Sequence, residues 1–470
     1  MKILEWIKGV IGRMFRKDAQ KVFGIKVEYS SIMENAIMQW QNILSGRPYW
    51  LDKENHIDTI NFAKLITSDV AKKICLDIDI NVDGSARADY LSEVVEELKK
   101  VLRDKVEDAC GLGGIMFKPN GSSLKGDCIS YIFPNDFLIT DADANGNIRG
   151  AIFFDYDTDI KEEKYYTRME YQRFEREQYL ISNRVFCSKI KGQLGKEISF
   201  DDTPAWQNIL PEAQIENVRD TLFAFYKPPY NNTFENASPL GVSVFSNAIK
   251  ELRDLDVAWS RKSNEVEDSQ HITFVNADQV AYTENQHVKL PRFIRTLDLG
   301  SGVGDEANIH EHVATLLTEQ RIADINSILS MISTKCGFSQ GAFVLDRKTG
   351  NITATQVEAD DRETIETIKE MRDALKDTLD HLIYALNVYA DLYDLAPAGE
   401  YEASYGFGDL TYNYEEDRAR HWNYVIQGKY PLYRYYMKFE GMSEKEARTV
   451  VKEAKSENNP DDKDDMFGKE

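Results

Sequence analysis

Cysteine and histidine are scarce in this chain, and neither is spaced as in a metal or redox motif. The sequence holds five scattered cysteines: Cys75, Cys110, Cys128, Cys187 and Cys336. Because none of them forms a Cys-x-x-Cys pair, we expect reduced thiols and neither a disulfide framework nor a zinc site. The seven histidines give no His-Glu-x-x-His motif, since His310, Glu311 and His312 have the wrong spacing. No metal and no cofactor are therefore predicted.

Long apolar runs are also missing. No segment approaches the roughly 20 apolar residues of a membrane span, so no transmembrane helix is predicted. Residues 1–24 instead predict an amphipathic helix, with Ile3, Leu4 and Ile7 on one face and basic residues around them. Charged residues interrupt it too early for the core of a signal peptide. Such a helix lies on a membrane surface or docks on a protein partner, and we favour the partner.

Basic residues are outnumbered. The 57 lysines and arginines face 79 aspartates and glutamates, and the formal net charge is −22. This balance argues against a surface that reads a DNA sequence, which is normally basic. It is compatible with a protein past which DNA slides, because tight binding to phosphates needs many cations that release counterions.

Motifs of catalysis are absent or incomplete. No Gly-x-Ser-x-Gly nucleophile elbow occurs, and the glycine run at 300–304 lacks the Gly-Lys-Ser/Thr ending of a phosphate loop. Paired carboxylates at 201–202 and 360–363 raise a metal-dependent nuclease or transferase as an alternative. The second pair stands where a helix should begin, and acidic residues suit that position because of the helix dipole. We therefore expect no enzyme.

Two acidic segments resemble the first half of a calcium-binding loop. They are 79–84 and 141–148, and each lacks the glutamate that closes such a site, since Tyr90 and Ile152 stand there. Both are predicted to be hairpin or loop turns.

The strongest positive signal is a long helical pattern at 353–395. Apolar residues recur there at steps of three and four, or at sums of these: Ile365, Ile368, Leu375, Leu379, Leu382 and Leu386. No proline or glycine interrupts the stretch between Gly350 and Pro397. About 35 helical residues would span roughly 50 Å, and we expect the helix to stop at the proline.

The first half of the chain changes from helical to strand periodicity. Helices are predicted at 59–74 and 90–109 within a mostly helical region at 25–110. Beyond the glycines at 111–114 the period becomes two, and strands are predicted at 115–118, 128–133, 151–156, 164–174, 178–189 and 198–200. This order of elements predicts the α+β class.

Two further helices are predicted around a small β unit. Ser238 and Pro239 suit the start of the first helix, whose apolar stripe is Phe245, Ile249, Leu252 and Leu255. Strands are expected at 271–276, 280–282 and 292–297. The second helix runs from about 309 to 334 and carries Leu316, Ile325 and Ile328. A polar loop at 337–351 with Arg347 and Lys348 follows it.

The tail is predicted to be helical at 414–427 and 430–439. A third helix begins at the capping box of Ser443 and Glu446.

Four short motifs, in this order and spacing, resemble those of phage portal proteins, closest to those of tailed phages that infect Gram-positive bacteria. They lie at 238–256, 336–343, 353–357 and 441–447. The third contains Gln356 where the family usually has glutamate. The resemblance covers about residues 20–455.

The resemblance implies a portal fold with long stem and wing helices, a small α/β clip and a helical crown. The implied boundaries are an N-terminal helix at 1–24, a wing at 25–237, a first stem helix at 238–270, a clip at 271–310, a second stem helix at 311–336, a tunnel loop at 337–352, a long, kinked wing helix at 353–398, a crown at 399–456 and a disordered tail at 457–470.

Portals are rings, usually of about twelve subunits, at one capsid vertex. By resemblance, this chain would form the channel for packaging and ejecting double-stranded DNA, in a virion assembled in the host cytoplasm. Its partners would be the terminase large subunit, the head-completion adaptor, and the major capsid and scaffold proteins. Arg347 and Lys348 would contact DNA phosphates loosely, although an ordinary solvated loop remains open. A scaffold or coiled-coil assembly protein that forms no ring is the main alternative.

Overall fold

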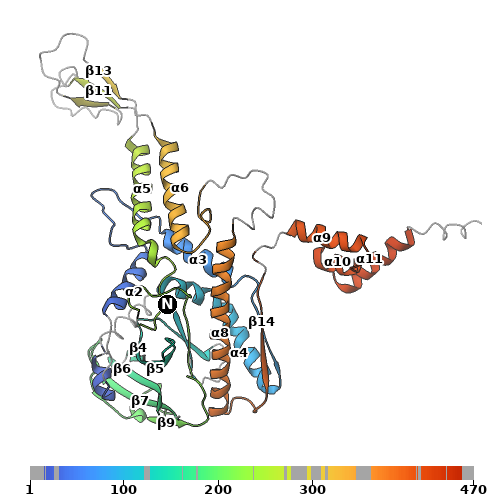
Figure 1. Ribbon diagram of the computed structural model, residues 1–470. Coiled ribbons are helices and arrows are strands. Elements are labelled where there is room, and N and C mark those ends of the chain that lie inside the picture. The colour runs from blue at the N-terminus through green and yellow to red at the C-terminus, as the bar shows by residue number, and fades with distance from the viewer. Residues whose placement is uncertain are drawn as a thin grey trace, which may run out of the picture. The chain divides into compact units, whose positions relative to one another are not determined.

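The computed structural model describes most of the chain in two compact units. Unit 1 comprises Met1–Asn351 and Ala359–Phe407, and unit 2 comprises Ile352–Glu358 and Gly408–Glu470. The described residues are 15, 17–25, 31–120, 127–160, 162–175, 178–236, 238–268, 272–276, 294–297, 309–312, 316–345, 361–408, 410, 414–440 and 442–457. Figure 1 shows the elements of each unit. Both helices and sheets are present, as the α+β prediction requires.

Helices α2 (Ser31–Leu44), α3 (Phe62–Ile74) and α4 (Ala86–Leu112) form the first part of unit 1. α3 begins three residues later than predicted, because Asn61 takes a left-handed conformation with φ 52°. α4 is longer than predicted and ends where Gly113 adopts φ 83°. Its inward stripe is fully buried: Leu91, Val94, Leu98, Leu102 and Val106.

The acidic segment between α3 and α4 is a strand, and the prediction of a turn there was wrong. β1 (Asp79–Gly84) pairs antiparallel with β14 (Tyr401–Gly406), more than 300 residues later in the chain. Ile80 and Val82 are buried, and the acidic residues alternate with them on the exposed side. The alternation of buried and exposed residues that is typical of a strand was therefore present in the sequence. The acidic residues led to the prediction of a turn because they matched part of a calcium-binding loop.

Two sheets follow α4. The first has the order β10-β2-β3, and the second has the order β4-β5-β6-β7-β8, with β9 also paired to β7. Their strands are β2 (Ile115–Pro119), β3 (Ile129–Ile132), β4 (Phe137–Ala142), β5 (Ile148–Asp159), β6 (Lys164–Glu175), β7 (Gln178–Ser188), β8 (Lys196–Glu197), β9 (Glu212–Ile215) and β10 (Ala224–Tyr226).

Most of the predicted strands are confirmed within a few residues. The strand predicted at 198–200 is wrong, because β8 ends at Glu197 and Phe200–Asp202 is a 3-10 helix. The second acidic segment is the turn between β4 and β5, as predicted. Its Asp143 N–H donates to the Asn147 carbonyl at 2.9 Å, and Gly146 has φ 77°.

The described end of the N-terminal segment packs on the chain's own second sheet. Phe15 and Ala19 are buried in one cluster with Leu138, Ile152 and Met169. Phe15, the described residue of the predicted apolar face, is therefore covered by the chain's own sheet. Docking of the rest of that face on a protein partner stays a prediction. Residues 1–14 lie outside the described part of the chain.

Helices α5 (Ile249–Asp268) and α6 (Thr318–Lys335) flank a small mixed sheet in sequence. That sheet has the order β12-β11-β13 and contains β11 (Ile272–Asn276), β12 (Ile294–Leu297) and β13 (Ile309–His312). β12 is parallel to β11, and β13 is antiparallel to it. The strand predicted at 280–282 and the glycine run at 300–304 lie outside the described residues.

Both of these helices begin later than predicted. α5 does not start at Ser238, because the segment before it is held extended against the end of α4. There the Val244 N–H donates to the Cys110 carbonyl at 2.9 Å. A Cβ on Gly241 would come within 2.2 Å of the Gly113 carbonyl oxygen. α6 does not start near Ile309, because residues 309–312 pair as β13.

The longest described helix is α8 (Arg362–Leu392), with 31 residues. At 1.5 Å per residue it is about 46 Å long. It ends five residues before Pro397, which corrects the predicted end. Asp394 turns left-handed with φ 50°, and the Leu395 N–H donates to the Ala390 carbonyl at 3.0 Å. α8 is assigned as one continuous helix, and the kink implied by the resemblance stays a prediction. Residues 353–360 lie outside the described part of the chain.

Unit 2 contains α9 (Tyr414–Ile426), α10 (Leu432–Phe439) and α11 (Glu444–Glu457). The predicted capping box is confirmed: the Ser443 N–H donates to Glu446 Oε2 at 3.0 Å, and the Glu446 N–H donates to Ser443 Oγ at 3.4 Å. The boundary of the crown at residue 399 is wrong, because β14 belongs to unit 1.

Candidate functional site

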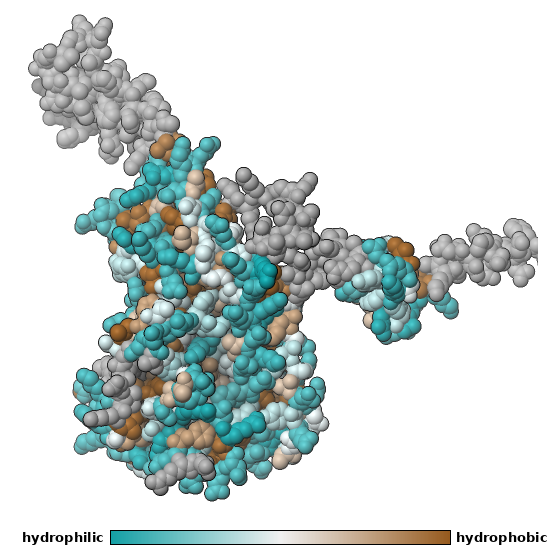
Figure 2. Space-filling model, viewed as in Figure 1, coloured by the Kyte–Doolittle hydropathy of each residue, from teal (hydrophilic) through white to brown (hydrophobic). Residues whose placement is uncertain are grey.

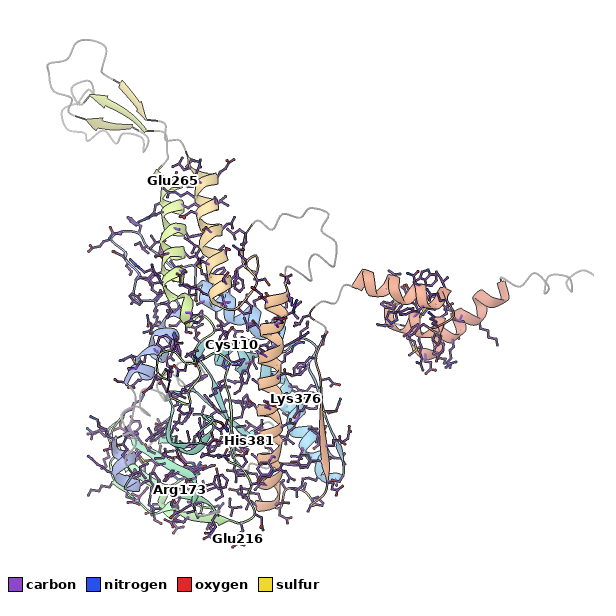
Figure 3. The ribbon with its side chains drawn as sticks, viewed as in Figure 1. Cys110, Arg173, Glu216, Glu265, Lys376 and His381 are labelled. Atoms are coloured by element: carbon purple, nitrogen blue, oxygen red, sulfur yellow. The ribbon has the colours of Figure 1, made fainter. Side chains whose placement is uncertain are left out.

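The α5–α6 pair is fixed by ion pairs near both of its ends. Glu265 accepts the Leu317 N–H at 2.8 Å and pairs with Arg321 Nε at 2.8 Å. These two donors lower the pKa of the Glu265 carboxyl below its ordinary value. Near the other end, Lys335 Nζ lies 2.7 Å from Glu251. Glu265 marks the end of α5 that leads to the small sheet (Figure 3).

The predicted apolar stripes of α5 and α6 are mostly buried. Phe245, Leu252, Leu255 and Ile325 are each at most 3% exposed. Ile249 and Ile328 are half-buried. Leu316 lies before the first residue of α6 and is 46% exposed. Phe245 lies before the first residue of α5. The prediction that these two residues stand in the helices was therefore wrong.

A strap of residues 47–60 holds α5 from another side. Trp50 Nε1 donates to Asp256 Oδ2 at 2.8 Å, and the Ile60 N–H donates to Asp256 Oδ1 at 3.1 Å. Burial raises the pKa of the Asp256 carboxyl, and the hydrogen bonds oppose that shift. Ser260 Oγ accepts the Asp58 N–H at 3.1 Å. The first half of α5 is therefore fixed to the body of unit 1.

The chain is anchored on both sides of residues 346–360. Ser339, before this segment, and Thr364, after it, bind each other. The Ser339 N–H donates to Thr364 Oγ1 at 3.0 Å, and the Thr364 N–H donates to Ser339 Oγ at 3.3 Å. Thr367 Oγ1 also donates to the Gly337 carbonyl at 2.5 Å. These contacts join the segment after α6 to the first turns of α8. Arg347 and Lys348 lie between the anchors, outside the described residues.

α8 is buried along the predicted face. Its core residues Ile368, Leu375, Leu379, Leu382 and Leu386 are at most 2% exposed, and Ile365 is half-buried.

Two buried arginines fix α8 further. Arg372 donates to the Lys73 carbonyl at 2.7 Å and to the Ile74 carbonyl at 3.2 Å, at the end of α3. Arg87 of α4 binds the end of α8 and donates to the Asn387 and Ala396 carbonyls at 2.8 and 2.6 Å. Carbonyls in the last turn of a helix lack partners within it, so the Arg372 guanidinium satisfies those of α3. Arg87 instead joins the last turns of α8 to the segment that follows the helix.

A buried ion network lies inside the second sheet and the adjoining β2. Lys118 Nζ is 2.8 Å and Arg168 Nη2 is 2.9 Å from Glu170 Oε2, and all three side chains are buried or nearly so. Burial would raise the pKa of Glu170, but the two cations outweigh it and hold the pKa below its ordinary value. The network contains no nucleophile or open substrate position, and its fixed geometry is typical of a structural core.

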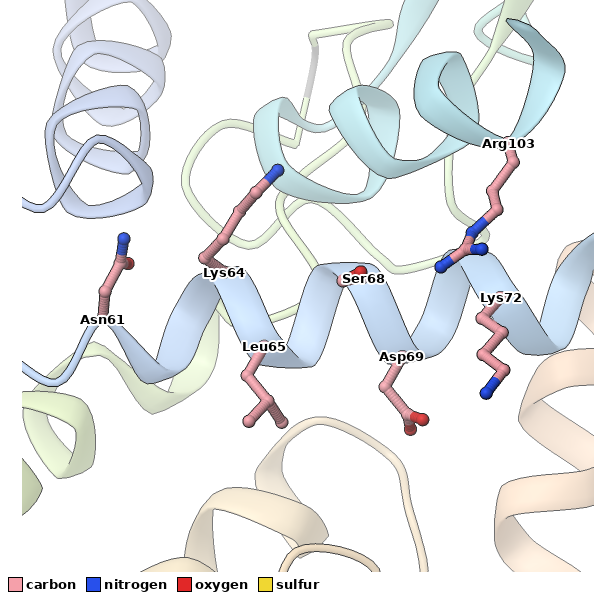
Figure 4. A pocket seen from close by; sticks show the side chains of 7 residues that line it. All are labelled: Asn61, Lys64, Leu65, Ser68, Asp69, Lys72 and Arg103. Carbon is pink, nitrogen blue, oxygen red and sulfur yellow. The ribbon is translucent and has the colours of Figure 1, made fainter. Parts of the chain in front are cut away.

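An open hollow of about 540 Å³ lies along α3, lined by Asn61, Lys64, Leu65, Ser68, Asp69, Lys72 and Arg103 (Figure 4). Several of its charges are neutralised locally: Lys64 pairs with Glu107, and Asp69 pairs with Lys73. It contains neither histidine nor cysteine, and its carboxylate and cations do not form a catalytic arrangement.

Within the described ranges, no group of three or more His, Cys, Asp or Glu side chains is arranged to hold a metal ion. Asp201 and Asp202 are exposed in a 3-10 turn, and Asp361 and Glu363 stand at the start of α8. Across the same ranges, no helix has the length and apolar character needed to cross a bilayer.

Sequence reasoning missed the buried polar residues that hold these elements together. Arg87, Arg372 and Asp256 stand in ordinary helical patterns, and nothing local in the sequence distinguishes them from surface charges. Their partners are far away in the chain, since Arg87 contacts residues about 300 positions later.

The sequence profile described as phage portal protein, SPP1 Gp6-like, matches residues 17–460, which is nearly the whole chain. No curated protein matches the sequence significantly. The match includes the two helices of the pair, the small sheet between them and the long helix α8. The chain therefore belongs to the SPP1 Gp6-like family of phage portal proteins and serves as a portal for DNA packaging in the virion.

Proposed function

We propose that about twelve copies of this chain close into a ring at one capsid vertex of a tailed phage that infects a Gram-positive bacterium. Double-stranded DNA passes through the ring during packaging and ejection. The observation that supports this most strongly is the order of described elements: helix α5, small sheet, helix α6 and long helix α8, with residues 336–361 between the last two. It is the order of stem, clip, stem, tunnel loop and wing in the family that the chain resembles.

In this proposal α5 and α6 are the two stem helices. The small sheet between them is the clip, which docks the terminase large subunit and later the head-completion adaptor. Residues 337–352 are the tunnel loop, α8 is the wing helix, and unit 2 is the crown. The major capsid and scaffold proteins surround the ring, which assembles in the host cytoplasm.

Two physical features suit a channel. The α5–α6 pair is tied at both ends and strapped to the body of the unit, so it can act as a stiff wall element. The anchors at Ser339 and Thr364 keep the two sides of the tunnel loop together while DNA moves past it.

Mass photometry of the purified chain tests the proposal. We expect a closed species of about twelve copies, and a population of monomers and small open oligomers at high concentration would support a scaffold protein instead. The same preparation, incubated with DNA and Mg²⁺ or Mn²⁺, should leave the DNA intact. Metal-dependent cleavage would support the alternative of a nucleic-acid enzyme.

A further inference from the structure

One side of α5 carries three cations that form no ion pair among the described residues, with Asp254 between them. Lys250, Arg253 and Arg261 are exposed, and steps of three and eight residues bring them to one side of the helix. None of the ion pairs among the described residues includes them, whereas Arg321 and Lys335 of α6 are both paired.

The outward side of α8 carries the opposite charge. Six acidic residues recur there at steps of three and four, and all are exposed: Glu363, Glu366, Glu370, Asp373, Asp377 and Asp380. They lie opposite the buried face of the helix. Glu366 pairs with Arg362, and Asp380 accepts the Tyr405 hydroxyl. No ion pair among the described residues includes the other four. Figure 2 shows a mostly hydrophilic surface along α8.

The first turns of α5 and α8 lie close to each other along the direction of the α5–α6 pair, because both contact the end of α6 or the residues just after it. Lys335, at the end of α6, pairs with Glu251 in the first turn of α5. Two residues later, the Gly337 carbonyl accepts the Thr367 hydroxyl in the second turn of α8. Lys250 and Arg253 therefore lie close to the level of Glu363 and Glu370.

Ring symmetry makes this shared level significant. In the proposed ring the axis runs along the α5–α6 pair. Rotation about that axis moves each residue around the ring without changing its height along these helices, so a contact between neighbouring copies joins residues of similar height. Copies that each carry a net charge of −22 repel one another, and a contact of opposite charges would offset part of that repulsion.

We propose, building on the ring proposed above, that the basic face of α5 in one copy contacts the acidic face of α8 in the next. Lys250 and Arg253 face Glu363 and Glu370 across this junction. The contact is heterologous, since it joins two different surfaces of the same chain, as closure of a ring requires.

DNA phosphates are the other possible partner of the basic face. A DNA contact would explain the cations of α5 but not the matching acidic stripe of α8 at the same level. The junction between copies accounts for both.

Charge reversal tests the junction. Lys250→Glu with Arg253→Glu should abolish rings in mass photometry, and so should Glu363→Lys with Glu370→Lys. Combining the four substitutions should restore the rings. Lys189→Glu with Lys191→Glu is the matched control, because it makes the same change of charge at exposed, unpaired lysines on another element. Circular dichroism of each variant verifies that the subunit remains folded.

The outcomes separate this inference from the proposed function. If the unsubstituted chain forms no rings, the proposed function fails. If it forms rings but the four-substitution chain does not, the junction is wrong. Rings that survive the α5 reversal and lose only DNA retention would also overturn it and assign the basic face to DNA.

Discussion

At the scale of single residues, buried charges fix the body of unit 1. Glu170 is ionised in the core because Lys118 and Arg168 both lie within 3 Å of it. Removing one partner of such a network leaves the others buried and uncompensated, which costs far more than the network contributes as a whole.

We expect Glu170→Gln to destabilise the subunit by about 3–5 kcal/mol at pH 7. The folded pKa of Glu170 lies below its ordinary value of 4.5, so the network stabilises the fold above that pH. This contribution is lost as the pH falls through the folded pKa, and the substitution should therefore flatten the loss of stability in acid. Urea unfolding at pH 7 and pH 4 measures both effects. Glu175→Gln, on the exposed end of the same strand, should change little, and equal effects of the two would contradict the account.

Arg87 gives a second prediction. Arg87→Met removes the donors to the Asn387 and Ala396 carbonyls and the ion pair with Asp391, and hydrogen bonds to charged groups contribute about 1.5–3 kcal/mol each. We expect a loss of at least about 2 kcal/mol in thermal or urea unfolding. The control is Arg103→Met, an exposed position of the same helix, which should unfold like the unsubstituted chain. A stable Arg87→Met subunit would show that water replaces the guanidinium at no cost.

The tunnel-loop residues give a third prediction. Arg347→Ala with Lys348→Ala should leave ring assembly intact and weaken the retention of non-specific duplex DNA at low salt. The difference should vanish at high salt, because phosphate contacts of this kind act through counterion release. Filter binding over a salt series measures it, with Lys189→Ala and Lys191→Ala as control. Unchanged retention would mean that the two residues belong to an ordinary solvated loop.

At the scale of elements, α8 is the helix on which unit 1 depends. Its buried face packs against α3, α4, β2 and β10. One end is bound by Ser339 and the other by Arg87. A charged side chain introduced into that buried face would have no ion-pair or hydrogen-bond partner there.

We therefore expect Leu375→Asp to prevent stable folding, whereas Leu375→Ala should cost about 2–5 kcal/mol. Lys369→Ala, on the exposed side of the helix, is the control. Expression yield and circular dichroism of the three variants give the comparison. A folded Leu375→Asp subunit that fails only in DNA passage would contradict a structural role for this face.

Part of this arrangement of elements could be predicted from the sequence. The helical period predicted the buried face of α8, and the period of two predicted most of β5, β6 and β7. The starts of α5 and α6 were missed for tertiary reasons: residues 238–245 pack on the end of α4, and residues 309–312 pair with β11. β1 was missed because its partner, β14, is remote in sequence.

The candidate site was predictable only in part. Apolar stripes indicate which helices pack, so Leu252, Leu255 and Ile325 could be assigned to the core. The anchors at Ser339 and Thr364 and the strap at Trp50 and Asp256 depend on contacts between distant segments. Such hydrogen-bonding residues do not recur at regular spacing in the sequence, so no pattern predicts them. Their partners can be identified only in the folded structure.

At the scale of the whole molecule, the account is that long helices of many copies stand side by side around a hole. The family match shows a portal. In the ring proposed above, the tied α5–α6 pair would supply stiff elements of the wall. A net charge of −22 per copy would disfavour firm binding of DNA to that wall, so that the duplex could slide.

Averaged electron micrographs of the purified particles, viewed along their symmetry axis, would show whether the copies enclose a channel. We expect a closed ring with a central opening wide enough to admit a B-form duplex. Particles that are filled at the centre, or whose opening is too narrow for a duplex, would contradict it.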